Sequence, residues 1–133
     1  MRIPRPEVDI NEKIINGKRN VEITLLEDML FTFPPDDVIW LLPRRMYVPA
    51  GYVSDGASVP RCLWKILSPQ ICDTTLGPSI GHDWLYDNHK RYGLSRRECD
   101  LWYHGALYDN GYPGWKCDLT YIGVRLGGWT HWR

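Results

Sequence analysis

The segment His82-Asp83-Trp84-Leu85-Tyr86 holds the side chains of this sequence that are best suited to chemistry. On a helix, His82 and Tyr86 lie four residues apart and share one face, while Asp83 points about 100° away. Asp100 falls on the next expected helix, and an antiparallel pairing of the two helices would bring it to His82. A carboxylate that holds a histidine fixes the ring tautomer and stabilises the imidazolium. The pattern therefore predicts His82 as a general base, with Asp100 and Tyr86 beside it.

Arg97 and His104 stand one turn before and one turn after Asp100, so we expect both to support the site. The same residues also allow other roles. Asp83 could ligate a hard cation such as calcium, or His82, Asp83 and Asp100 could share a zinc ion. Alternatively, the histidine and the two aspartates form a buried polar network that only joins the helices.

A second segment of interest runs from Val48 to Arg61 and contains two glycines, two prolines and small polar residues. Asp55 and Ser58 could cap a helix that begins at Pro60. In the functional interpretation this loop lies over His82, where Asp55 supplies a further metal ligand or anchor. Glycine would let its backbone approach a ligand closely. Both interpretations stay open.

The elements that must position these residues change from strands to helices near residue 60. Strands are expected at 21–26, 29–33, 38–42, 46–48 and 51–53, and helices at 60–67, 80–90, 95–108 and 113–125. Glu27-Asp28 is interpreted as a hairpin turn. Ser95 and Glu98 form the pattern of a capping box. The fold class is therefore α+β, with a small antiparallel sheet followed by a three- to four-helix layer that contains an antiparallel helix pair.

We expect one domain, divided into an extended arm or edge strand at 1–18, strands and a loop at 19–59, helices at 60–126 and a tail at 127–133. The tail carries Trp129 and Trp132, and it either docks on a partner or folds back onto the core.

The charge composition argues against a general nucleic-acid binder, because 16 basic and 16 acidic residues leave no basic excess. The four cysteines show no CxxC pair, and we expect mostly reduced, buried thiols. No apolar region of a signal peptide and no transmembrane segment is visible in the sequence.

Three blocks of the sequence, VPAGYVSDGASVPR, GHDWLY and SRRECDLWYHGAL, occur in this order. They resemble an uncharacterised family of small tailed-phage and prophage proteins with a VPxGFxTDxASVPR loop, an HDxLY helix and an SRxxAD helix. Ser54, Gly56 and Cys99 depart from that pattern. The resemblance implies a phage origin near tail and lysis functions.

The arrangement of His82, Asp83, Tyr86 and Asp100 is also similar to the helix pair of secreted and parvoviral phospholipase A2. In that family the histidine activates water, the next aspartate binds calcium, and the tyrosine and the second-helix aspartate orient the histidine. The resemblance implies these roles for the four residues here. This chain lacks the disulfide framework of the secreted enzymes and a clear glycine-rich calcium loop before His82.

We therefore expect a tailed-phage late protein, tail- or lysis-associated, with a His/Asp hydrolase-like site that acts on a cell-envelope ester or amide. It would be made in the host cytoplasm, associate with the virion, contact other tail or virion proteins, and use calcium or zinc if a metal takes part. The alternative is a non-catalytic tail or baseplate component or assembly factor, in which the His–Asp cluster is a folding clamp. An inhibitor of a host defence protein is a third hypothesis.

Overall fold

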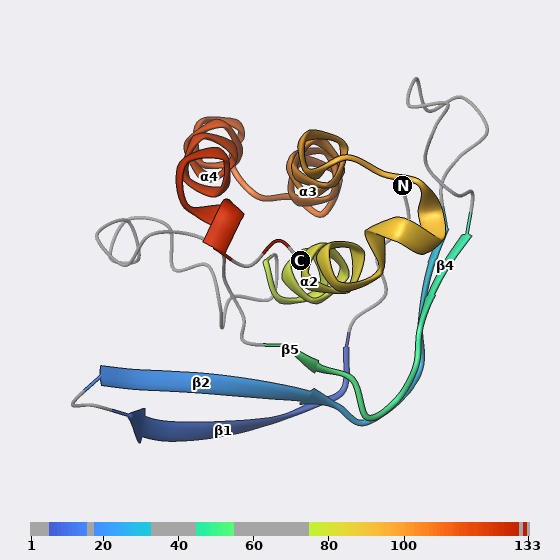
Figure 1. Ribbon diagram of the computed structural model, residues 1–133, viewed down its shortest axis with the longest axis vertical. Helices are drawn as coiled ribbons and strands as arrows, with labels where there is room; N and C mark the ends of the chain where they lie inside the picture. Colours follow the sequence, from blue (N-terminus) through green and yellow to red (C-terminus); the bar gives the residue numbers. More distant parts are fainter. Residues whose placement is uncertain (1–5, 16–17, 33–44, 55–74, 131, 133) are drawn as a thin grey trace.

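Strands come first and helices second in the computed structural model of the chain, which describes residues 6–15, 18–32, 45–54, 75–130 and 132 (Figure 1). Within these residues, small antiparallel sheets are followed by three packed α-helices, so the predicted α+β class is confirmed. The strand expected at 38–42, the helix expected at 60–67, and the candidate residues Asp55 and Ser58 lie outside the described residues.

The first sheet has the strand order β1-β2-β5. Strand β1 (Val8–Ile15) pairs with β2 (Lys18–Leu25), and β2 also pairs with the short strand β5 (Val53–Ser54). The segment expected as an arm or edge strand therefore contains the edge strand β1. Ile23 stands opposite Ser54, which brings the end of β5 to the buried side of the sheet.

The second sheet consists of β3 (Met29–Thr32) and β4 (Arg45–Val48), which are antiparallel. The predicted hairpin at Glu27-Asp28 is wrong, because β2 and β3 belong to different sheets. The Asp28 carboxylate instead accepts hydrogen bonds from the Tyr47 hydroxyl and from the Ala50 backbone N–H at 2.7 Å. These bonds fix the chain where it crosses from one sheet to the other.

Three helices follow: α2 (Leu76–Tyr92), α3 (Arg96–Asp109) and α4 (Gly114–Gly127), with a 3-10 turn η2 (Gly128–Thr130) after α4. The capping box at Ser95 and Glu98 is confirmed, since each accepts a hydrogen bond from the backbone of the other. Helix α2 begins four residues earlier than predicted. Pro78 is tolerated there because the first turn of a helix needs no intrahelical N–H donors. None of the described helices has the length and apolar character needed to cross a bilayer.

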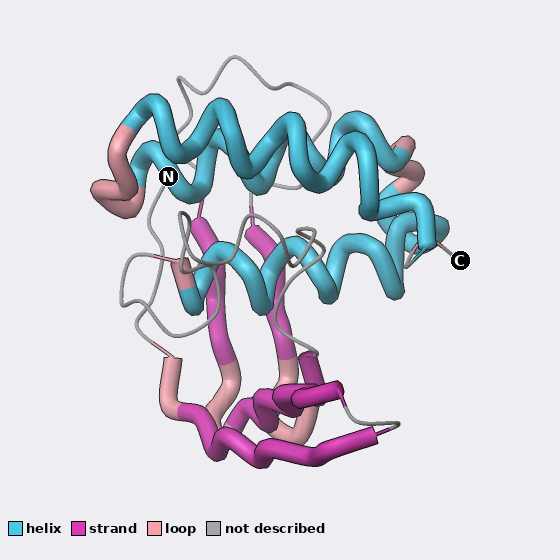
Figure 2. Tube along the Cα trace, turned by 90° about the vertical axis from the view of Figure 1, so that its left-hand side faces the viewer, coloured by secondary structure: helices cyan, strands magenta, loops and turns pink. Residues whose placement is uncertain are grey.

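Helix α2 lies between the first sheet and the pair formed by α3 and α4, and the other two strands rise past α2 towards that pair (Figure 2). The buried face of β3 meets this helical layer at Phe31, whose ring packs edge-on against Trp102 of α3 with centroids 5.4 Å apart. Gly81 of α2 faces the same Trp102 ring so closely that a Cβ at this position would overlap it. The absence of a side chain at Gly81 therefore sets how near α2 and α3 approach.

Candidate functional site

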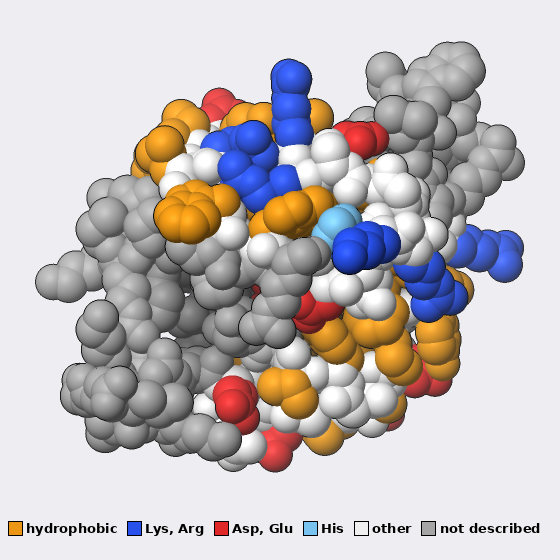
Figure 3. Space-filling view, viewed as in Figure 1, with side chains coloured by type: hydrophobic (Ala, Val, Ile, Leu, Met, Phe, Trp, Pro, Cys, Tyr) orange, Lys and Arg blue, Asp and Glu red, His pale blue; other side chains and the backbone are white. Residues whose placement is uncertain are grey.

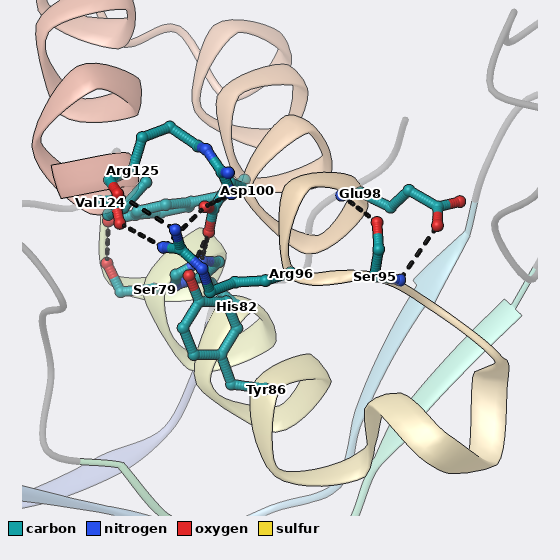
Figure 4. A network of polar contacts seen from close by, with 10 residues as sticks. Ser79, His82, Tyr86, Ser95, Arg96, Glu98, Asp100, Val124 and Arg125 are labelled. Atoms are coloured by element: carbon teal, nitrogen blue, oxygen red, sulfur yellow. Dashed lines mark hydrogen bonds and ion pairs between the residues drawn. The ribbon is translucent and has the colours of Figure 1, made fainter. Parts of the chain in front are cut away.

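The centre of the candidate site is Asp100 of α3, whose side chain is 0% exposed (Figure 4). Its Oδ1 atom is 2.8 Å from Nε2 of His82 and also accepts a hydrogen bond from the Tyr86 hydroxyl. Both partners come from α2, and they share one face because they are four residues apart. Ser79 of α2 meets Tyr103 of α3 one turn further along, so contacts run in opposite directions on the two helices, as predicted for an antiparallel pair.

The second oxygen of Asp100 connects the pair to α4. Nη1 of Arg125 donates to Oδ2 at 2.9 Å, and Nη1 of Arg96 lies 3.6 Å from the same oxygen. Arg96 also donates to the backbone carbonyls of Val124 and Arg125, at 3.1 Å each. These carbonyls stand in the last turn of α4, and the Val124 carbonyl also accepts the backbone N–H of the C-cap residue Gly128. One buried carboxylate thus joins all three described helices.

The electrostatic balance keeps Asp100 ionised. Burial raises the pKa of this carboxyl, but the hydrogen bonds and the charge of its partners, with His82 the largest contributor, outweigh burial and hold the pKa below its usual value. Burial and the neighbouring carboxylate raise the pKa of Tyr86 far above that of an ordinary phenol, so Tyr86 stays a hydrogen-bond donor. The site therefore contains a charged acceptor surrounded by donors.

The imidazole of His82 is held by rings on two sides. It stacks on Tyr103 with centroids 4.4 Å apart and planes 19° apart, and it lies 4.3 Å from the Tyr86 ring. Tyr103 is itself fixed by a 2.8 Å hydrogen bond to the Ser79 hydroxyl. Nε2 is the ring nitrogen that faces Asp100. The ring is 1% exposed.

Asp83 follows His82 but takes no part in the Asp100 network. Its Oδ2 atom accepts a hydrogen bond from the hydroxyl of Ser54 at the end of β5. A second link between this strand region and α2 runs from the Tyr52 hydroxyl to Asp87 at 2.7 Å. Among the described residues, no group of three His, Cys, Asp or Glu side chains is arranged to hold a metal ion. Of the two predicted metal ligands, Asp83 is described and Asp55 is not.

Two predicted supporting residues lie away from Asp100. Arg97 is exposed, and His104 bonds Asp118 of α4 at 2.8 Å, on the surface. Within the described part of the chain, neither makes a hydrogen bond or ion pair with Asp100. Arg96 and Arg125 take that place. The four-residue spacing from Arg96 to Asp100 is a sequence signal that could have identified Arg96, whereas Arg125 has none.

The C-terminal tail reaches back to α2. Trp132 stacks on His89 with ring centroids 3.7 Å apart and meets the edge of Tyr86 at 5.2 Å. Trp129, three residues earlier, is exposed. Trp132 thus folds back onto α2, and docking of the tail on a partner stays a prediction.

Comparison with known proteins places the site within a recognised family. The family model of the proteins of unknown function termed DUF1353 matches residues 37–124, which include His82, Asp83, Tyr86 and Asp100. The uncharacterised protein y4jT of Sinorhizobium fredii (strain NBRC 101917 / NGR234) is 33% identical over 85 residues, which are 62% of this chain and 24% of that protein. The chain thus spans about a quarter of that relative's length. No solved structure matches. The family match covers well over half of the chain, which therefore belongs to the DUF1353 family.

Proposed function

We propose that this protein is a hydrolase that uses His82 as a general base on an ester or amide of the bacterial cell envelope. The observation that carries the proposal is the 2.8 Å contact between Nε2 of His82 and the ionised, buried carboxylate of Asp100. A histidine oriented by a carboxylate is an arrangement that supports general-base catalysis. Tyr86 and Arg125 hold the same carboxylate in position.

In the proposed reaction, a ring nitrogen of His82 removes a proton from a water molecule as the water oxygen attacks the carbonyl carbon of the substrate. Asp100 stabilises the imidazolium that forms. The same nitrogen then returns the proton to the leaving oxygen or nitrogen as the scissile bond breaks. The products are a carboxylic acid and an alcohol or amine, and His82 is neutral again.

The described chain stops at Ser54, which bonds Asp83, and resumes at Thr75, whose carbonyl accepts the Ser79 N–H in the first turn of α2. Asp55 and Ser58 lie between these two residues and outside the described part of the chain, so their role at the site stays a prediction. Asp83 would supply one oxygen ligand if a divalent ion such as calcium or zinc takes part.

We place this activity in a tailed-phage late protein that is tail- or lysis-associated, because the three sequence blocks resemble those of small tailed-phage and prophage proteins. Such a protein would be made in the host cytoplasm, join the virion, and contact other tail or virion proteins. The balanced charge of the chain suits protein partners better than nucleic acid.

The test compares the parent protein with His82→Gln on two substrates, fluorescent phospholipid vesicles and labelled peptidoglycan. The matched control is His104→Gln, because His104 also bonds an aspartate at 2.8 Å but on the surface. Assays run with chelator, with calcium and with zinc, and Asp83→Asn reports on the metal. Release of product that His82→Gln loses and His104→Gln keeps supports the proposal. No product from either substrate, or an active His82→Gln, contradicts it.

A second function is favoured by the burial of the network. His82 is 1% exposed and both oxygens of Asp100 already have partners, as expected of a folding clamp in a non-catalytic tail or baseplate component. Under this hypothesis the protein occurs in purified virions in several copies. A phage that needs the protein would then remain infectious with a folded His82→Gln variant, whereas the hydrolase proposal expects loss of infectivity.

A further inference from the structure

One face of α4 and its extension η2 is apolar although it points away from the core. Trp115, Ile122, Leu126 and Trp129 are 60%, 52%, 71% and 65% exposed, and we call these four residues the α4 stripe. The buried residues of the same helix, which include Cys117 and Val124, lie on the opposite side. In Figure 3 hydrophobic side chains gather on the side of α4 that faces away from α3.

The stripe has a two-fold pattern about Ile122. Trp115 precedes Ile122 by seven residues and Trp129 follows it by seven. If two copies of α4 pack antiparallel with a two-fold axis at Ile122, each Trp115 meets the Trp129 of the other copy. Contacts of this kind, in which the same patch serves both subunits, are the commonest in homo-oligomers. Tryptophan is also the residue type most enriched where interface energy concentrates.

Charges beside the stripe fit the same arrangement. Asp118 precedes Ile122 by four residues and Arg125 follows it by three, so both fall on one flank of the helix, about 60° and 80° from Trp115. Across an antiparallel two-fold pair, the Asp118 of each copy stands within about one turn of the other copy's Arg125. The bond from Arg125 to Asp100 does not prevent this, because a guanidinium has five N–H donors. The flank is therefore complementary to itself.

We propose that the α4 stripe is the interface of a two-fold dimer of this chain. A helix of 14 residues is about 21 Å long, so the contact is small compared with a standard interface. The dimer should accordingly be reversible, with a dissociation constant in the micromolar range. This inference does not depend on the hydrolase proposal, since the stripe shares no residue with the His82 site.

Sedimentation equilibrium of the full chain, from about 1 to about 300 µM, tests the proposal over the range in which a micromolar dimer dissociates. Ile122→Lys should raise the dissociation constant at least about tenfold, because it places two like charges at the axis. Leu30→Lys is the control, since Leu30 is similarly exposed but lies on β3. Equal circular dichroism of both variants excludes misfolding.

Cross-linking gives an independent readout. Ile122→Cys should form an intermolecular disulfide on mild oxidation, because a residue near a two-fold axis meets its own copy. Leu30→Cys should not exceed the parent. A parent that stays monomeric over the whole concentration range overturns the proposal, and so does a dimer that Ile122→Lys leaves intact. Assemblies larger than dimers also overturn it, because a two-fold contact closes at two copies.

Discussion

Replacement of Asp100 by asparagine isolates the charge at the centre of the helix layer. Asparagine keeps the shape of the side chain but removes the negative charge that faces His82, Arg96 and Arg125. Loss of one partner from a buried ion pair costs about 3–5 kcal/mol. The asparagine oxygen can still accept from Arg125, so we expect the lower end, a loss of about 3 kcal/mol of unfolding free energy.

The magnitude can be checked against a matched pair on the protein surface. His104 and Asp118 are also 2.8 Å apart, but Asp118 is 74% exposed. Exposed pairs contribute less than about 1 kcal/mol, so Asp118→Asn should be nearly neutral. Because the two pairs have equal lengths, the difference between the two variants measures what burial and the additional donors contribute.

Urea unfolding at pH 7, followed by the fluorescence of the tryptophans, is the assay. At this chain length 1 kcal/mol corresponds to roughly 3–5 °C in the melting temperature, so a thermal melt of Asp100→Asn should fall by about 9–15 °C. A loss below about 1 kcal/mol, or one equal to that of Asp118→Asn, would refute the reasoning that the Asp100 charge holds the helices together.

Three further predictions follow from individual contacts. The pKa of Asp100 is lower in the folded state than in the unfolded chain. The contribution of the ionised carboxylate to stability is therefore complete above about pH 3.9 and is lost as the pH falls through the folded pKa. The difference in unfolding free energy between the parent and Asp100→Asn should be present at pH 5 and shrink below about pH 4. Gly81→Ala should lower the unfolding free energy by about 1–3 kcal/mol because its Cβ overlaps Trp102, whereas Gly114→Ala, with nothing within 4 Å, should be neutral in the same urea titration. Burial raises the pKa of Cys99 to about 12, so iodoacetamide at pH 8 should label this thiol on the order of a thousand times more slowly in the folded protein than in urea. Mass spectrometry of the peptide that contains Cys99 measures the two rates, and equal rates would contradict the prediction.

Local chemistry explains which parts of the fold could be predicted from the sequence. The capping box at the start of α3 is made by Ser95 and Glu98, which are three residues apart, and it is predicted correctly. The meeting of His82 with Asp100 followed from helical periodicity and from the few residues that separate α2 and α3. Such features rest on residues that are close together in the sequence.

The parts that were not predicted depend on contacts between distant segments. The chain near Glu27-Asp28 fits a hairpin turn locally. However, β2 pairs with β5 and β3 pairs with β4, so β2 and β3 do not pair with each other. Arg125 reaches Asp100 from 25 residues away, and only the packing of α4 against α3 brings it there. A one-residue difference on a helix also separates Arg96, which reaches the carboxylate, from the exposed Arg97.

Arg125 and Arg96 supply fixed positive charge to the buried carboxylate of Asp100. A buried carboxylate needs compensation, and in a pair made of His82 and Asp100 alone that compensation would require a protonated imidazole. Here the guanidinium groups of Arg96 from α3 and Arg125 from α4 face the second oxygen, at 3.6 and 2.9 Å. Positive charge beside Asp100 therefore does not come from His82 alone, although His82 makes the largest favourable contribution to keeping this carboxyl ionised. The same two arginines connect α3 to α4, so a folding clamp and a catalytic dyad would use the same arginines and the same aspartate. Asp100 is needed both by a folding clamp and by the proposed dyad, so a change at Asp100 cannot tell the two functions apart. The activity test therefore changes His82.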